Sequence, residues 1–135
     1  MSEEKTVAQE LAEIRNVIVG DEVIELTIKG KTKEDPSVYL TCTSLSQEEI
    51  SNIEKEMIKR QIDTNDVSEW SKINRRLKLV FAMKEIKFKG KVIDTSDRIV
   101  LEDFLKTFPD KTIQAIYLNY ENQLNEIYDR IIKKN

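Results

Sequence analysis

Residues 22–43 read EVIELTIKGKTKEDPSVYLTCT, and this stretch decides the class of the fold. Its apolar residues occupy every second position in two runs, Ile24, Leu26 and Ile28 and then Val38, Leu40 and Cys42. A period of two is typical of a strand that buries one face. Gly30 and Pro36 interrupt the chain between the runs, as the residues of a connecting loop do. The stretch therefore predicts two antiparallel strands joined by a charged loop.

Elsewhere the apolar residues mostly follow helical spacing. A three-four repeat predicts helices over residues 6–19, 46–61, 66–83, 97–107 and 113–131. Ser46 and Glu49 have the spacing of a capping box at the start of the second helix. Residues 85–94 alternate apolar and charged positions, which predicts a short hairpin or extended excursion that turns at Gly90.

The 135 residues fit one domain of ordinary size. Hydrophobic residues make up 39% and charged residues 35%, a balance typical of a folded domain with a heavily charged surface. The predicted fold class is α+β. We expect short amino-terminal antiparallel strands and a helix within residues 1–44, followed by a mainly helical carboxyl-terminal bundle over residues 45–135.

The sequence lacks most of the side chains that enzymes and metal sites use. It has no histidine, one cysteine and three glycines, and the glycines are not spaced as a phosphate-binding loop. A single cysteine excludes zinc sites built from several thiolates, and we expect Cys42 to be a buried, inert thiol. We therefore predict no catalytic, cofactor-binding or metal-binding residues, and a function other than catalysis.

Carboxylates are the remaining candidates for a metal or acid–base site. Asp63 and Asp66 form one pair, and Asp94 and Asp97 form another. Each pair lies in a polar break before a predicted helix, where aspartate commonly caps the first turn. Helix capping is therefore the favoured interpretation of both pairs.

Aromatic side chains on the predicted helices are the candidates for binding a protein partner: Trp70, Phe104, Phe108, Tyr117, Tyr120 and Tyr128. Aromatic residues are common anchors of protein interfaces. For Trp70 core packing is the favoured interpretation, and for the tyrosines it is the edge of the core with hydroxyl groups in water; partner binding is the alternative for both. The apolar stripe over residues 113–131 is long for one small core, so we expect the last two helices to form the contact surface.

Charge and hydropathy limit the classes of partner. The net charge is −3, and basic residues are interleaved with acidic ones, a pattern that disfavours nucleic acid. The most basic stretch, residues 84–91 (KEIKFKGK), together with Arg75 and Arg76, leaves a nucleic-acid-binding alternative open. No apolar run approaches the length of a membrane span and the amino terminus lacks a signal-peptide pattern, so we expect a soluble cytoplasmic protein without membrane contact.

Three segments carry a resemblance to a known family. A polar-capped helix follows a strand (SLSQEEI, 44–50), and a long helix ends in an apolar run before a Lys-Gly-Lys turn (INRRLKLVFAMKEIKFKGK, 73–91). A Leu-x-x-Phe-Pro step then precedes a helix of Ile, Leu and Tyr (within LEDFLKTFPDKTIQAIYLNYENQLNEI, 101–127). From Val38 onward this layout resembles small assembly proteins of tailed bacteriophages, especially tail assembly chaperones.

The resemblance implies a non-enzymatic protein-binding role in the host-cell cytoplasm. Proteins of this kind bind the tape-measure or tube proteins of a tail and cover their aggregation-prone surfaces until assembly. The physical basis is that exposed apolar helices and strand edges aggregate unless a partner covers them. One alternative is a minor structural protein that oligomerises and stays in the virion. The second alternative is a small nucleic-acid-binding regulator.

Overall fold

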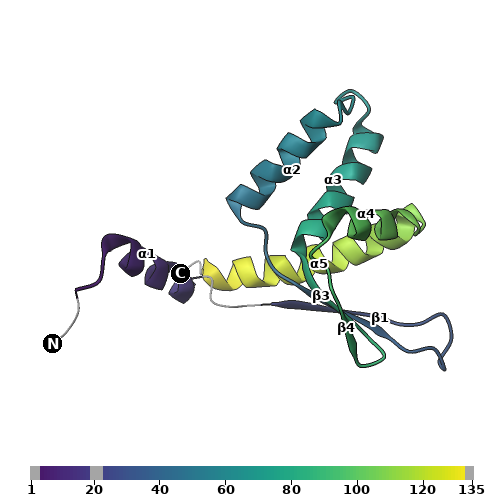
Figure 1. Ribbon diagram of the computed structural model, residues 1–135, viewed down its shortest axis with the longest axis horizontal. Coiled ribbons are helices and arrows are strands. Elements are labelled where there is room, and N and C mark those ends of the chain that lie inside the picture. The colour runs from purple at the N-terminus through teal and green to yellow at the C-terminus, as the bar shows by residue number, and fades with distance from the viewer. Residues whose placement is uncertain (1–3, 19–22, 133–135) are drawn as a thin grey trace.

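The computed structural model describes residues 4–18 and 23–132. Its elements are α1 (Val7–Ile18), β1 (Ile24–Ile28), β2 (Val38–Cys42), α2 (Gln47–Lys59), α3 (Val67–Ala82), β3 (Met83–Phe88), β4 (Lys91–Ile93), α4 (Arg98–Lys106) and α5 (Asp110–Ile131) (Figure 1). This composition confirms the predicted α+β class. Across the described ranges no helix is long and apolar enough to span a membrane.

The strands form one antiparallel sheet in the order β1-β2-β3-β4. Leu40 of β2 pairs with Leu26 of β1 on one side and with Ile86 of β3 on the other. The predicted β1–β2 pair is therefore confirmed. The predicted hairpin at Gly90 is confirmed as well, because Lys89 and Gly90 form a two-residue turn in which both have a positive φ, 53° and 73°. Such turns match the right-handed twist of the strands that they join.

The β3–β4 hairpin belongs to the same sheet as the amino-terminal strands. The sequence predicts strands in residues 1–44 and a mainly helical remainder, but in the structure β2 pairs with β3. The physical reason is that β2 has two edges and β1 occupies only one of them. An unpaired strand edge exposes backbone hydrogen-bonding groups, and β3 satisfies them from more than 40 residues away in the chain.

The core lies on one face of this sheet. Buried side chains from three strands form that face: Ile24, Leu26, Leu40, Cys42, Met83 and Ile86. Helix α5 packs against β1, and α3 packs against α2, α4 and α5, so that the helices lie above the sheet in Figure 1. Cys42 is buried, as predicted, and this burial raises the pKa of its thiol to about 12.

Helix α3 is the element on which the packing converges. Its last turns are buried on nearly all sides, through Leu77, Leu79, Val80, Phe81 and Ala82. The chain passes into β3 without a loop, because Met83 is already extended. The N–H group of Thr43 donates to the carbonyl of Ala82 at 3.0 Å. This hydrogen bond fastens the end of α3 beside the end of β2.

Capping side chains fix the starts of four helices, among them α1, where Thr6 and Gln9 each accept from the other's N–H group. The Ser46 hydroxyl accepts from the N–H group of Glu49, and the Glu49 carboxylate accepts from the N–H group of Ser46, both at 3.1 Å. This confirms the predicted capping box of α2. Asp66 and Asp97 accept from first-turn N–H groups of α3 and α4. Each cap satisfies backbone donors that a helix leaves unpaired at its amino end.

Tyr120 joins the last helix to the centre of the sheet. Its side chain is 2% exposed, and its hydroxyl donates to the carbonyl of Thr43, directly after β2, at 2.8 Å. Burial is the main cause that raises the pKa of this hydroxyl above its ordinary value. The ring supplies buried apolar area and the hydroxyl satisfies a backbone acceptor, so Tyr120 fixes the position of α5 along β2.

We predict that Tyr120→Phe lowers the free energy of unfolding by about 1–2 kcal/mol, because it leaves the carbonyl of Thr43 without its donor. Urea unfolding followed by circular dichroism measures the change. The matched control is Tyr128→Phe, which removes a hydroxyl from an exposed position on the same helix and should change the free energy by less than about 0.5 kcal/mol. Equal effects of the two substitutions would contradict this role of Tyr120.

Candidate protein-binding site

The structure separates the six aromatic residues that were predicted to bind a partner: Trp70, Phe104, Phe108, Tyr117, Tyr120 and Tyr128. Trp70 lies on α3 and is 37% exposed, whereas Phe104 lies on α4 and is 47% exposed. Phe108 and Tyr117 are half-buried against the core, and Tyr128 is exposed near the end of α5. The rings of Phe104 and Phe108 come together with their centroids 5.0 Å apart. The six candidate residues therefore do not form one continuous surface.

The prediction that Tyr120 binds a partner is wrong, because its side chain is buried in the core. The apolar stripe of α5, which the sequence analysis considered long for one small core, mostly packs against the core of the same chain. Ile113 is buried, and Ile116, Leu124 and Ile127 pack against the core. Helix α5 covers both β1 and α3, and this double contact requires a wide apolar face. Tyr128 remains as its exposed aromatic residue.

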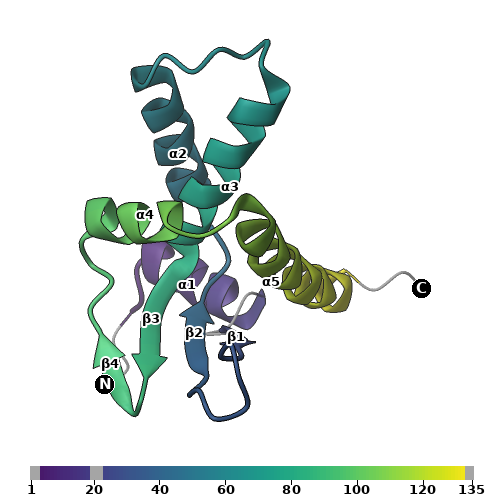
Figure 2. The ribbon, with the colours of Figure 1, turned by 90° about the vertical axis from the view of Figure 1, so that its right-hand side faces the viewer.

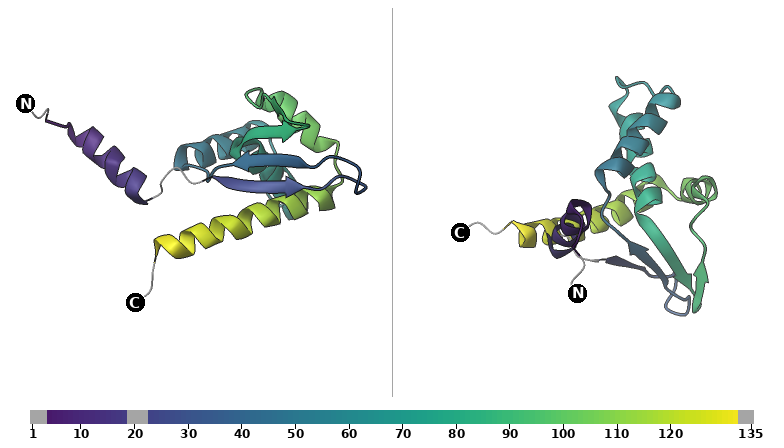
Figure 3. Two further views of the ribbon diagram at one scale, coloured as in Figure 1. Left: turned by 90° about the horizontal axis from the view of Figure 1, so that it is seen from below. Right: turned by 60° about the vertical axis from the view of Figure 1, so that its left-hand side comes forward.

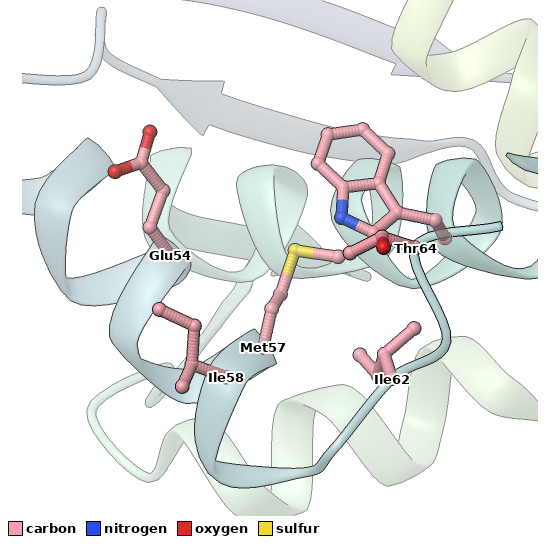
Figure 4. Close-up of a pocket in the computed structure, with 6 residues that line it drawn as sticks. Glu54, Met57, Ile58, Ile62 and Thr64 are labelled. Atoms are coloured by element: carbon pink, nitrogen blue, oxygen red, sulfur yellow. The ribbon is translucent and has the colours of Figure 1, made fainter.

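A pocket lies between α2 and α3 at the end where a loop connects them. It has a volume of about 270 Å³ and is lined by Glu54, Met57, Ile58, Ile62, Thr64 and Trp70. Figure 4 shows Met57 reaching into this space from α2, with Ile62 on the loop that follows. The amide nitrogen of Asn74 donates to the sulfur of Met57 at 3.3 Å. An adaptable methionine beside a half-exposed tryptophan is a surface that accepts an apolar side chain from outside.

The outer side of α4 is a second apolar surface. Leu101 and Leu105 of this helix are buried, whereas Ile99, Val100 and Phe104 are exposed. Val100 and Phe104 lie one turn apart on α4, and Phe108, which follows the end of the helix, contacts the ring of Phe104, so the three side chains form one row. The row begins in solvent and ends at the edge of the core. A partner that covered it would extend the core outward.

Helix α1 is the third and most complete apolar surface. Val7, Leu11, Ile14 and Ile18 form its apolar stripe, and each of them is between 52% and 71% exposed. None of the described residues of α1 is buried. The left view of Figure 3 shows this helix standing apart from the sheet and from α2 to α5. The stripe is therefore free to bind another surface.

Periodicity predicted helix α1, but none of its residues was among the predicted partner-binding ones. Its signal in the sequence is an amphipathic stripe of only about three turns, separated from the first strand by Gly20 and Asp21. A helix of this length is marginal in water without tertiary contacts. The described residues of the domain leave this apolar face uncovered.

The most strongly perturbed carboxyl group lies among helices α2, α3 and α4. Glu102 of α4 accepts two hydrogen bonds from the guanidinium of Arg60, at 2.6 and 2.8 Å, and one from Arg76 at 3.0 Å. These hydrogen bonds, first those from Arg60, lower the pKa of Glu102 from 4.5 to about 2. The cluster fastens α4 to both helices of the α2–α3 pair and thereby orients the exposed side of α4.

One carboxylate of each pair considered for chemistry caps a helix. Asp66 and Asp97 cap α3 and α4, which confirms the capping interpretation for these two residues. Asp63 and Asp94 accept from the N–H groups of the residues two positions on, in the loops before these helices. Among the residues that the structure describes, no group of three or more Asp, Glu or Cys side chains is placed to hold a metal ion.

Several basic residues of the nucleic-acid alternative are engaged in ion pairs. Arg75 lies 3.6 Å from the carboxylate of Asp110, and Arg76 contacts Glu102. Lys84 donates to Glu49 at 3.1 Å and borders a second hollow of about 470 Å³ between the end of α3 and the start of α4. These cations are neutralised by partners on the helices. The remaining lysines of residues 84–91 lie on the β3–β4 hairpin.

We predict that Glu102→Gln lowers the free energy of unfolding at pH 7 by about 1–3 kcal/mol, because it leaves the guanidinium of Arg76 without its anion and that of Arg60 with Glu56 alone. The folded-state pKa of Glu102 is depressed, so its contribution is present above about pH 5 and is lost as the pH falls toward 2. The difference between wild type and variant should therefore shrink over that range in urea titrations. Glu54→Gln, an exposed position on α2, is the control. A difference that stays constant with pH would contradict this account.

Comparison with protein-family models, with curated proteins and with solved structures finds no match to this chain. Its function is therefore inferred from the chemistry of its own surfaces. Three of these are apolar and open: the stripe of α1, the outer side of α4, and the pocket between α2 and α3.

Proposed function

We propose that this chain is a non-enzymatic protein-binding protein of phage tail or virion assembly, which shields or positions a structural partner. The observation that carries the proposal is the exposed apolar stripe of α1, formed by Val7, Leu11, Ile14 and Ile18. The layout shared with tail assembly chaperones supports the same function. In this proposal the protein acts in the host-cell cytoplasm, and its partners are other phage structural or assembly proteins.

The energetics of α1 favour a bound state. Twelve residues form few helical hydrogen bonds, so the helix alone is marginal in water. Covering four half-exposed aliphatic side chains contributes on the order of 4 kcal/mol, at about 1 kcal/mol for each half-buried side chain. That contribution offsets part of the cost of ordering the helix and of association, so the partner must add contacts of its own. An amphipathic helix of this kind binds an apolar groove or pairs with another amphipathic helix.

The other two apolar surfaces suit a partner whose own apolar segment needs cover. The row of Val100, Phe104 and Phe108 leads from exposed positions to the edge of the core, whereas the pocket beside Trp70, of about 270 Å³, has room for a single large side chain. Temporary cover of such a segment prevents aggregation of the partner before it is assembled. Moderate affinity is compatible with this role, because the partner must be released on assembly.

Self-association through α1 is the first alternative, and it corresponds to a minor virion protein that oligomerises. The observation that favours it is that the stripe of α1 matches a second copy of itself, since two amphipathic helices can bury their stripes against each other. Mass in solution separates the two functions. A mass that rises with concentration in the absence of other proteins supports oligomerisation, and a constant monomer mass excludes it.

We predict that Leu11→Glu with Ile14→Glu weakens binding to the partner by about tenfold or more, because charge replaces the apolar centre of the stripe. The measurement is binding to purified tail tube and tape-measure proteins encoded in the same genome. Both residues are exposed, so the thermal unfolding of the domain should stay unchanged.

The matched control is Ala12→Glu with Asn16→Glu, which adds the same charge to the opposite side of α1 and should leave binding within about twofold. A wild-type protein that stays monomeric and binds none of these partners would remove the proposal. Equal loss of binding by both double variants would assign the effect to net charge instead of the stripe.

A further inference from the structure

Both hairpin loops of the sheet lie at the same end. The register aligns Ile28 of β1 with Val38 of β2, Val38 with Phe88 of β3, and Phe88 with Lys91 of β4. The β1–β2 loop at residues 29–37 and the β3–β4 turn therefore leave the sheet side by side. Figure 2 shows both at its lower end, away from α2, α3 and α4.

This shared end gathers six exposed lysines that are far apart in sequence: Lys29, Lys31, Lys33, Lys87, Lys89 and Lys91. We call it the lysine end. None of the six takes part in a salt bridge with a described residue. Glu34 and Asp35 are the acidic residues of these loops, and Asp35 is occupied by hydrogen bonds from the N–H and hydroxyl groups of Thr32. The lysine end therefore carries a net positive charge in a chain whose total charge is −3.

The β3–β4 turn contains a lysine in a left-handed backbone conformation. Lys89 has φ 53°, a conformation that costs a side chain other than Gly, Asn or Asp about 1 kcal/mol. Its partner Gly90 meets the requirement of the turn, with φ 73° and no side chain. The ammonium group of Lys89 lies over the ring of Phe88, 5.4 Å from its centroid, so the turn presents this charge beside the ends of β3 and β4.

The β1–β2 loop is also shaped to present its lysines. A side chain at Gly30 would lie 2.4 Å from the Cβ atom of Asp35, so this glycine allows the two sides of the loop to approach closely. The closure places Lys29, Lys31 and Lys33 on a compact loop rather than on an extended one.

We propose that the lysine end binds a short acidic segment of a protein partner. The sheet is about 15 Å wide across its four strands, a width that four or five extended residues span at about 3.3 Å each. Lysines at this spacing attract carboxylates, speed the encounter and lose strength as salt is added. The inference rests on the proposed protein-binding function and names the chemistry of one partner surface.

The observations favour an acidic peptide over nucleic acid. On the open face of the sheet Glu25 and Glu85 lie in register with Thr41, two residues from the row of Thr27, Tyr39 and Lys87. A long phosphate backbone that continued along this face would meet these carboxylates, whereas a short acidic segment ends before them. Tyr39 is the exposed aromatic ring in that row, and stacking of successive bases needs several.

The experiment measures binding of a fluorescent polyglutamate peptide to the full chain at about 50 and about 200 mM salt. We expect saturable binding at the lower salt concentration and at least tenfold weaker binding by Lys31→Gln with Lys89→Gln and Lys91→Gln. The control replaces Lys55, Lys59 and Lys72, which are exposed on α2 and α3, by glutamine and should bind within about twofold of wild type. Circular dichroism checks that all three proteins are folded.

Three outcomes would overturn the inference. Oligothymidylate of equal charge that binds more tightly than polyglutamate would assign the lysine end to nucleic acid. Equal loss of binding in both triple variants would reduce the effect to total charge. If the variant with Lys31, Lys89 and Lys91 replaced binds the peptide as wild type does but aggregates, these lysines only protect the edge strands from pairing with other chains.

Lys89→Asn gives an independent test. It relieves the backbone strain and removes one charge, so we expect a melting temperature higher by a few degrees together with weaker polyglutamate binding. A higher melting temperature with unchanged binding would contradict a use for the charge, and an unchanged melting temperature would contradict the strain.

The apolar stripe of α1 is intact in every lysine variant. If only polyglutamate binding is lost, the proposed function is not contradicted. If only the assay with tail proteins fails, the inference about the lysine end is not contradicted.

Discussion

Strand β2 is the constraint on which the rest of the structure depends. Its backbone is hydrogen-bonded on both sides, and its inward residues Leu40 and Cys42 are buried at the centre of the core. The end of α3 and the hydroxyl of Tyr120 both bond to Thr43, directly after this strand. β2 therefore fixes where β3 begins, how α3 meets the sheet and where α5 lies across it.

This arrangement also determines what is left for function. The helices that cover the sheet use their apolar faces on one side, and the carboxyl-terminal half of α3 is almost entirely engaged in internal contacts. The stripe of α1 and the outer side of α4 remain apolar and open. Because neighbouring hairpins turn at the same end of an antiparallel sheet, the lysines of two distant loops meet there. The proposed functions are thus consequences of which surfaces the fold leaves unused.

Local patterns were sufficient to predict most elements. Alternation identified β1 and β2, and the capping box at Ser46 and the turn at Gly90 marked boundaries that the structure confirms. Pairing of β2 with β3, the burial of Tyr120 and the ion pairs of Glu102 join residues that are distant in sequence, and no local period encodes them. The lysine end was missed for the same reason, because its two loops come together only through the sheet. The stripe of α1 was visible in the sequence, but its exposure depends on the rest of the fold.

Hydrogen exchange of the isolated monomer at low concentration distinguishes an open α1 from a docked one. We expect backbone amides of α1 to exchange about a hundredfold faster or more than those of β2, because α1 has no buried side chain whereas β2 is paired on both sides. Adding the partner should slow exchange in α1 and leave β2 unchanged. Protection of α1 equal to that of β2 in the isolated monomer would contradict the account.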